Sequence, residues 1–165
     1  MDGLYMSAAA LAALFMVLLL GAVLLSIVSR QFHFHVPGVD AYAGYLMAAA
    51  GFLALAHTLK RGEHIRVTLL INALRGKSRK ALEVWALAIA LLLAALFAFY
   101  SCRLVWQSYT FNDISTSNDA TPLWIPQLSM AWGTLVLAIA FLDELVLELR
   151  GQRRAPASGE MLRNE

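Results

Sequence analysis

The residues of this chain that could carry out chemistry are few and scattered. It has four histidines, His33, His35, His57 and His64, and only His57 lies inside a long apolar stretch. Transmembrane haem needs facing histidines on two helices at matched depth, and a metal site needs three or four converging ligands. The histidines therefore indicate loop or interfacial positions. We expect no catalytic residue, no metal site and no cofactor in this chain.

The single cysteine and the isolated glycines exclude further classes of activity. Cys102 has no second cysteine to pair with, so an internal disulfide and a C-x-x-C redox pair are both excluded. We expect a small buried or interfacial side chain there rather than a reactive thiol. Gly62 stands alone between Arg61 and Glu63, which indicates a break between two helices and not a phosphate-binding loop. The chain is therefore not expected to be an enzyme or an ATP-driven machine by itself.

Four long uncharged stretches account for most of the 165 residues. They predict membrane spans at about 4–29, 41–59, 84–102 and 122–142, because about 20 apolar residues of helix cross a bilayer. The apolar fraction of 60% and the mean hydropathy of +0.65 agree with this. The sequence predicts an all-α membrane protein, with one four-helix domain over residues 1–150 and a polar tail over 151–165.

The basic residues predict the orientation of the spans. Eleven of the 13 Lys and Arg residues flank one side, and only Arg30 and Arg103 flank the other. The positive-inside rule then places both termini in the cytoplasm. A net charge of +2 is too small to indicate a nucleic-acid partner, and basic residues beside the spans are better explained by membrane lipids and topology.

The loop between the second and third spans contains a helical pattern over about 64–75. Val67, Leu70, Ile71 and Leu74 fall on one stripe, with His64 among the residues on the other face. Basic residues flank this segment. The pattern predicts a short amphipathic helix along the inner membrane surface. A plain solvated connector is the alternative.

Small residues recur every three or four positions on one face of the second span. They are Gly44, Ala48, Gly51 and Ala54. Small side chains let membrane helices approach closely, so this face predicts a helix contact. The sequence leaves open whether the contact lies within the chain or with another subunit.

The fourth span opens with the stretch TPLWIPQ, Thr121–Gln127. Its helix is predicted to begin near Pro122 or Pro126, around Trp124, because the first-turn N–H groups have no helical partner in any case. Gln127 is then expected to satisfy a backbone or neighbouring polar group. The alternative is an ion site built from backbone carbonyls around Pro126.

A bundle with almost no ionisable residue inside its spans is expected to work with a partner, since such residues usually handle ions and protons at the midplane. One segment goes further. LKRGEHIRVTLL, Leu59–Leu70, resembles the signature of the small membrane subunit of tripartite ATP-independent periplasmic (TRAP) transporters, the DctQ-like family. The motif residues are Arg61, Gly62, Glu63, His64, Ile65, Arg66 and Val67. Further family features follow in order over residues 5–148: Arg30, Asp40 after Pro37-Gly38, the TPLWIPQ stretch and Trp132-Gly133.

The resemblance implies a scaffold in the bacterial inner membrane. Such a subunit joins a large multi-span permease subunit, which binds sodium and moves as an elevator, and a periplasmic substrate-binding protein delivers an organic acid. On the outer side, Arg30, Asp40 and Arg103 would contact that binding protein or form orienting pairs within the subunit. Many members carry two neighbouring acids where this chain has Asp40-Ala41, a departure that bears on any role for the acidic pair.

Three other functions remain as alternatives. A small autonomous exporter would need a membrane-embedded carboxylate, and none lies between the ends of the spans. A membrane oxidoreductase would need a histidine or cysteine pair. The third alternative is a non-catalytic subunit of another membrane complex.

Overall fold

The computed structural model describes residues 2–34, 36–60, 77–117 and 119–150 of the chain. These residues form four helices, α1 (Asp2–Gln31), α2 (Val39–Lys60), α4 (Lys77–Thr110) and α5 (Trp124–Leu149). Each helix contains an apolar segment long enough to cross a bilayer. The predicted all-helical fold with four spans is therefore confirmed.

Helix α4 is longer at both ends than the predicted span over 84–102. It begins at Lys77 and continues through Arg103 to Thr110. The prediction ended the span at the first charge, but a helical backbone does not end there, because a long charged side chain can extend to the headgroups. At 1.5 Å per residue the helix is about 51 Å long, against about 30 Å of hydrocarbon. Arg103 is therefore a helical residue, whereas the predicted span over 84–102 left it in the following loop.

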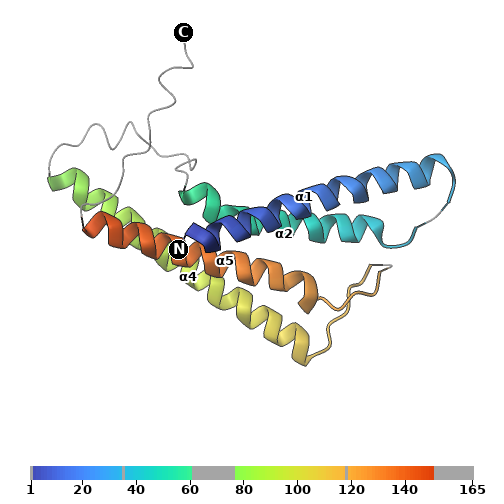
Figure 1. The fold of residues 1–165 in the computed structure, drawn as a ribbon. Coiled ribbons are helices and arrows are strands. Elements are labelled where there is room, and N and C mark those ends of the chain that lie inside the picture. Colours follow the sequence, from blue (N-terminus) through green and yellow to red (C-terminus); the bar gives the residue numbers. More distant parts are fainter. Residues whose placement is uncertain (1, 35, 61–76, 118, 151–165) are drawn as a thin grey trace, which may run out of the picture.

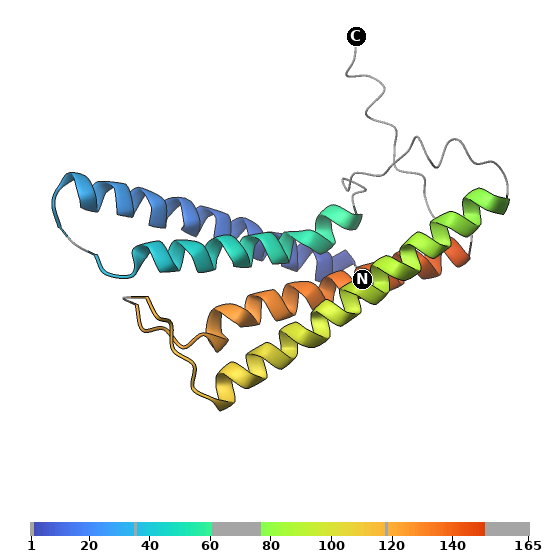
Figure 2. The ribbon, with the colours of Figure 1, turned by 180° about the vertical axis from the view of Figure 1, so that it is seen from behind.

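The helices pack in the order α1, α2, α5, α4. The main contacts join α1 to α2, α2 to α5 and α5 to α4. Figures 1 and 2 show that the hairpins α1–α2 and α4–α5 diverge towards the end that carries their connecting loops. We call this end the loop end. Helices α2 and α5 are thus the two central elements, and α1 and α4 lie at the edges.

Helix α5 buries one of its faces against α2 and α1. Val136 and Ala140 of α5 form a buried cluster with Ala56 and Leu59 of α2 and Tyr5 of α1. The other contact of α5 is with α4. Along α4, buried side chains recur every seven residues, which is the spacing of a seam between two helices. These residues are Leu87, Ala94, Ser101 and Ser108, and Ala98 is buried between two of them.

The small-residue face of α2 lies beside these contacts and does not form them. Gly44, Ala48 and Gly51 are exposed, and Ala54 is half-buried. No heavy atom lies within 4 Å of a Cβ built at Gly44 or Gly51. The buried positions of α2 are Ala49, Ala50, Leu53, Ala56 and Leu59. The sequence left open whether this face contacts another helix of the chain or another subunit. For the exposed residues Gly44, Ala48 and Gly51, contact with another subunit stays a prediction.

The start of α5 agrees with the expected role of its prolines. The helix begins at Trp124, between Pro122 and Pro126, so the missing N–H of Pro126 falls in the first turn and costs no helical hydrogen bond. The Pro122 carbonyl accepts from the Ile125 N–H at 3.2 Å. The Pro126 carbonyl accepts from the Ser129 hydroxyl at 2.7 Å. Both carbonyls are occupied by donors of the chain, which does not favour the alternative of an ion site.

The side chain of Gln127 does not behave as the sequence predicts. Its Oε1 atom is buried and has no hydrogen-bond partner among the described residues. The expectation that this amide satisfies a neighbouring group is therefore wrong for that oxygen. The motif residues 61–67 and the predicted amphipathic helix over 64–75 lie outside the described residues, as does the tail over 151–165.

Candidate docking site at the loop end

The helices α1 and α4 end at the loop end in the same way. A residue in the left-handed region follows each helix, His33 with φ 56° and Asn112 with φ 52°. In each case the next N–H donates to a carbonyl five residues back, Phe34 to Ser29 at 3.1 Å and Asp113 to Ser108 at 3.0 Å. These are the bonds of a Schellman motif, which usually uses glycine at the left-handed position. Neither motif has the usual signal in the sequence, because neither left-handed residue is a glycine.

Arg30 and Asp40 form an ion pair across the first connection. Arg30 Nη2 lies 3.2 Å from Asp40 Oδ2, and the Ser26 hydroxyl donates to Asp40 Oδ1 at 2.9 Å. Arg30 is in the last turn of α1 and Asp40 in the first turn of α2, where the helix dipoles favour these charges. Both side chains are 75% exposed, so the pair adds little to stability. The structure brings these two predicted residues together at a surface that remains open to a partner.

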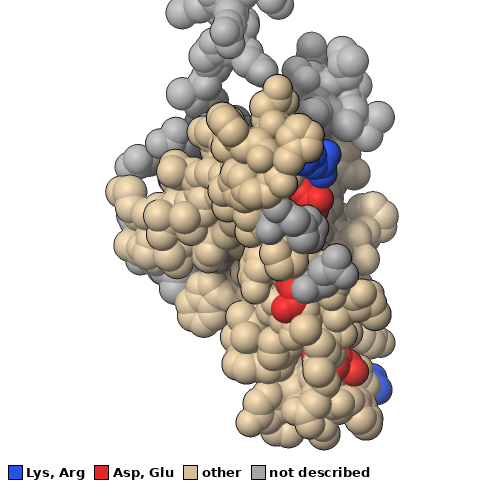
Figure 3. Space-filling model, turned by 90° about the vertical axis from the view of Figure 1, so that its right-hand side faces the viewer, with Lys and Arg blue, Asp and Glu red and all other residues tan. Residues whose placement is uncertain are grey.

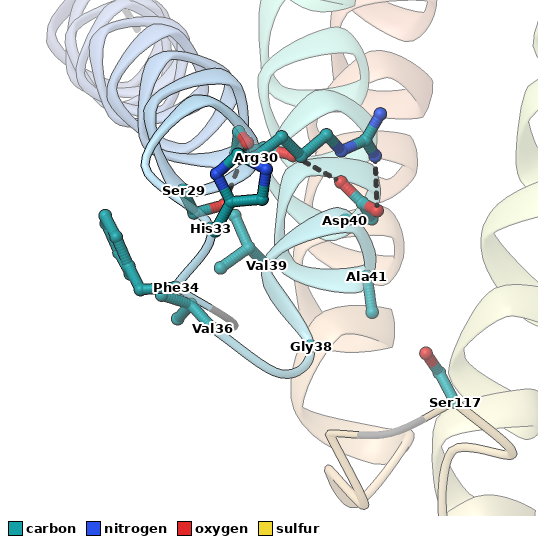
Figure 4. Close-up of a pocket in the computed structure, with 11 residues that line it drawn as sticks. Ser29, Arg30, His33, Phe34, Val36, Gly38, Val39, Asp40, Ala41 and Ser117 are labelled. Carbon is teal, nitrogen blue, oxygen red and sulfur yellow. Dashed lines mark hydrogen bonds and ion pairs between the residues drawn. The ribbon is translucent and has the colours of Figure 1, made fainter.

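A hollow of about 400 Å³ surrounds this pair. Figure 4 shows Arg30 extending towards Asp40, while Ser117 of the second connection approaches the hollow from the other hairpin. Ser29 and His33 also line it. The lining therefore combines charged groups of both signs with hydroxyl groups, which suits polar side chains of a partner protein.

A cluster of polar side chains joins the second connection to α2. The Tyr45 hydroxyl donates to Asp119 Oδ2 at 3.1 Å and lies 2.9 Å from the Ser115 oxygen. Ser115 donates to the other carboxylate oxygen, Asp119 Oδ1, at 2.9 Å. We call Tyr45, Ser115 and Asp119 the Asp119 cluster. Nearby, the hydroxyl oxygens of Thr121 and Tyr42 lie 3.2 Å apart, within hydrogen-bond distance. The cluster ties the α4–α5 hairpin to the α1–α2 hairpin at the loop end.

Gly38 makes this contact possible. Its φ of +83° lies in the region that side chains disfavour, and a Cβ built there would fall 2.8 Å from Asp119 Cβ. A glycine is therefore needed for both the turn and the close approach. The Pro37-Gly38 turn was evident in the sequence, but its contact with Asp119 was not.

The electrostatic state of Asp119 follows from its donors. The Thr121 side chain lowers the pKa of the Asp119 carboxyl most, desolvation opposes this, and Ser115 and Tyr45 lower it further. The net result is a pKa below the ordinary value of 3.8. Asp119 is therefore a carboxylate at neutral pH. Ser115 and Asp119 are half-buried, although the surrounding stretch is rich in polar residues.

The third predicted contact residue lies elsewhere. Arg103 lines a groove between α4 and α5 with Met130, whereas Arg30 and Asp40 line the hollow at the first connection. Figure 3 views the loop end directly. Most of this surface is uncharged, and the acidic and basic side chains lie in a few separate places. The three predicted residues therefore do not form one charged patch.

The residues that could perform other chemistry are not assembled. No group of three or more His, Cys, Asp or Glu within the described ranges could hold a metal ion. Cys102 is exposed on α4, so the expectation of a buried side chain is wrong and the interfacial alternative stays a prediction. His33 lies in the first connection and His57 on α2 near the opposite end. The chemistry of the site is therefore that of ion pairs and hydrogen bonds.

A comparison with known protein families identifies the family of the chain. The family described as tripartite ATP-independent periplasmic transporters, DctQ component, matches residues 19–151. The chain belongs to the DctQ family. A comparison with curated proteins finds no match. As a DctQ chain with four apolar helices, it is a multi-pass membrane protein and a component of a transporter. The resemblance noted at 59–70 is thus confirmed at the level of the family.

Proposed function

We propose that this DctQ chain is the static scaffold subunit of a sodium-coupled TRAP transporter for an organic acid. The observation that carries the proposal is the family match, which includes α2, α4, α5 and the C-terminal part of α1. In this proposal a large permease subunit moves as an elevator and holds both the substrate and sodium. A periplasmic binding protein delivers the substrate, and the DctQ chain contributes no cofactor.

The packing order supports a scaffold role. Because α1 and α4 lie at the edges of the fold, large apolar side chains on both helices remain exposed. Such surface is available to lipid and to the helices of a larger subunit. The exposed small residues of α2, Gly44, Ala48 and Gly51, offer a further face where a partner helix could approach closely.

The loop end supports a docking role. In the proposed orientation both termini lie in the cytoplasm and the loop end faces the periplasm. The Arg30–Asp40 pair would then be presented to the binding protein, and the Asp119 cluster would hold the two hairpins at a fixed separation. Exposed charges of this kind steer encounters and fix register more than they add affinity.

Reconstitution tests the proposal. The DctQ chain is co-expressed with candidate permease and binding-protein partners from its genome, and uptake of labelled carboxylates into proteoliposomes is measured with and without a sodium gradient. We expect uptake only when all three proteins and the gradient are present. Uptake by permease and binding protein at an unchanged rate without the DctQ chain would contradict the scaffold role.

Cysteine labelling tests the orientation. In a Cys102→Ser background, Ser117→Cys reports on the loop end and Ser78→Cys on the opposite end. We expect a membrane-impermeant maleimide to label Ser117→Cys in intact spheroplasts and to label Ser78→Cys only after lysis. The reverse pattern would contradict cytoplasmic termini.

A further inference from the structure

A groove between α4 and α5 carries an inference beyond the scaffold role. It has a volume of about 400 Å³ and is lined almost entirely by apolar side chains, among them Phe97, Tyr100 and Leu104 of α4 and Met130 of α5. Ser101, Arg103 and Gln107 supply its polar groups. From Phe97 to Gln107 the groove follows α4 for roughly 15 Å. It is therefore an elongated apolar groove on the surface of the chain, with the Arg103 cation towards its Gln107 end.

The level of the groove along α4 is defined by its neighbours. The uncharged part of α4 ends at Cys102, and Arg103 is the next residue. Exposed aromatic residues follow, including Trp106, which is 71% exposed, and Tyr109. Tyr and Trp favour the headgroup level of a bilayer. The Phe97 end of the groove thus faces hydrocarbon, and Arg103 lies where the headgroups begin.

The charge of Arg103 has no counter-ion within the described part of the chain. Its side chain makes no ion pair and no hydrogen bond with another described residue. A guanidinium at this level presents a planar fork of donors, which matches the oxygens of a phosphate. Charge and geometry both point to a phosphodiester as its partner.

The groove is shallow beside a protein helix, because 15 Å of a helix about 10 Å wide fills roughly 1,200 Å³ against about 400 Å³ here, so a helix could seat only one face in it. An extended acyl chain is much thinner. We propose that this groove binds one glycerophospholipid of the leaflet at the loop end, with its phosphate on Arg103 and an acyl chain along Phe97, Tyr100, Leu104 and Met130.

Native mass spectrometry of the full chain in detergent tests this site. Three probes are added separately: phosphatidylglycerol, a diacylglycerol with the same chains but no phosphate, and inorganic phosphate. We expect wild type to retain one phosphatidylglycerol, and Arg103→Gln to weaken its retention about tenfold, as for loss of one charge-assisted contact. Diacylglycerol and inorganic phosphate should each bind at least tenfold more weakly.

Two further variants test whether lipid retention depends on this groove or only on the overall charge of the chain. Arg30→Gln removes the same charge at the same end of the molecule and should retain phosphatidylglycerol as wild type does. Leu104→Trp fills the groove and should displace the lipid while Arg103 remains. Arg103→Lys should retain the lipid, because the cation is kept. If Arg103→Gln is poorly folded by circular dichroism, Leu104→Trp carries the test, and if Leu104→Trp is poorly folded, Arg103→Gln does.

Other results would overturn the proposal. Equal lipid retention by wild type and Arg103→Gln would mean that the phosphate does not lie on this residue. Equal retention of diacylglycerol would mean that the groove selects hydrocarbon alone. If Tyr100→Cys, with Cys102→Ser, forms a cross-link to a permease cysteine in high yield, a protein helix occupies the groove instead.

Discussion

Gly133 of α5 lies directly against the backbone of Phe52 in α2. A Cβ built at Gly133 would fall 2.5 Å from the Phe52 carbonyl oxygen and 2.6 Å from its carbonyl carbon. Both atoms belong to a helical backbone, so they cannot move aside as a flexible side chain would. This contact fixes the separation between the two hairpins, because α2 and α5 are the helices that join them.

We therefore expect Gly133→Ala to destabilise the protein. Carbon atoms prefer separations of about 3.5–4.0 Å, so α2 and α5 would move apart by about 1 Å. Overpacking of this kind typically costs about 1–3 kcal/mol. The measurement is the thermal unfolding midpoint in detergent by circular dichroism, and the midpoint should fall.

Gly51→Ala is the matched control for that substitution. Gly51 is also helical, but nothing lies within 4 Å of its added Cβ. Alanine favours a helix by about 1 kcal/mol over glycine, so the midpoint should stay or rise. A Gly133→Ala protein that melts with wild type would show that the helices can separate without cost.

The Asp119 cluster predicts a pH dependence of stability. The folded pKa of Asp119 lies below its ordinary 3.8. The carboxylate therefore stabilises the fold fully above the unfolded pKa, and this contribution is lost as the pH falls through the lower, folded value. Asp119→Asn cannot ionise, so the difference in unfolding midpoint between wild type and variant should be constant near neutral pH and shrink below about pH 4.

Asp113→Asn provides the control for the pH series. Asp113 lies in the same connection, but its exposed side chain takes no part in the cluster. Its unfolding profile should follow that of wild type more closely than Asp119→Asn does. If the difference between wild type and Asp119→Asn widens on acidification, the sign of the argument is wrong.

The presence of four spans could be predicted from sequence because it depends on a single local property, a long run without charge. The ends of α4 could not, because the residues from Arg103 to Thr110 mix charged, polar, aromatic and aliphatic side chains yet are still helical. The start of α5 near Pro126 was predicted because proline restricts the chain locally. A feature that depends on neighbouring residues alone could therefore be predicted, and one that depends on the rest of the fold could not.

Contacts between segments that lie far apart in the sequence could not be predicted from local sequence patterns. Tyr45 and Asp119 are 74 residues apart, and neither residue type indicates the other. The small residues of α2 suggested a close approach, yet the close approach falls at Gly133, which was noted only as part of the Trp132-Gly133 family feature. A stripe of small side chains permits a contact, but the faces of the neighbouring helix decide where it occurs.

The Arg30–Asp40 pair predicts a separation between stability and transport. Because both side chains are 75% exposed, a double-mutant cycle with Arg30→Gln and Asp40→Asn should give a coupling of only about 0.2–1 kcal/mol, which salt reduces further. If the pair contacts the binding protein, each single variant should still slow uptake in the reconstituted system.

A charge swap distinguishes the two roles that the sequence left open for this pair. Arg30→Asp combined with Asp40→Arg restores the internal ion pair but reverses what a partner meets. We expect uptake to remain slow in the swapped protein, with an unfolding midpoint close to that of wild type. Recovery of uptake by the swap would assign the pair to internal orientation instead.

Gln127 predicts that a substitution can stabilise the isolated chain. Its buried Oε1 accepts no hydrogen bond within the described part of the chain, and leaving such an atom unsatisfied costs about 1–3 kcal/mol. Gln127→Leu removes the atom at similar size and should raise the unfolding midpoint. Gln107→Leu, at an exposed position of α4, should change it much less.

The same variant also tests whether this oxygen is used in the assembled transporter. If a donor of the permease satisfies the Gln127 amide, Gln127→Leu should stabilise the chain alone but weaken its co-purification with the permease. If no donor of the permease reaches this oxygen, Gln127→Leu should stabilise the isolated chain and the complex with the permease equally. A lower unfolding midpoint of the isolated chain would contradict the premise, because it would mean that the Gln127 side chain makes a favourable contact inside the fold.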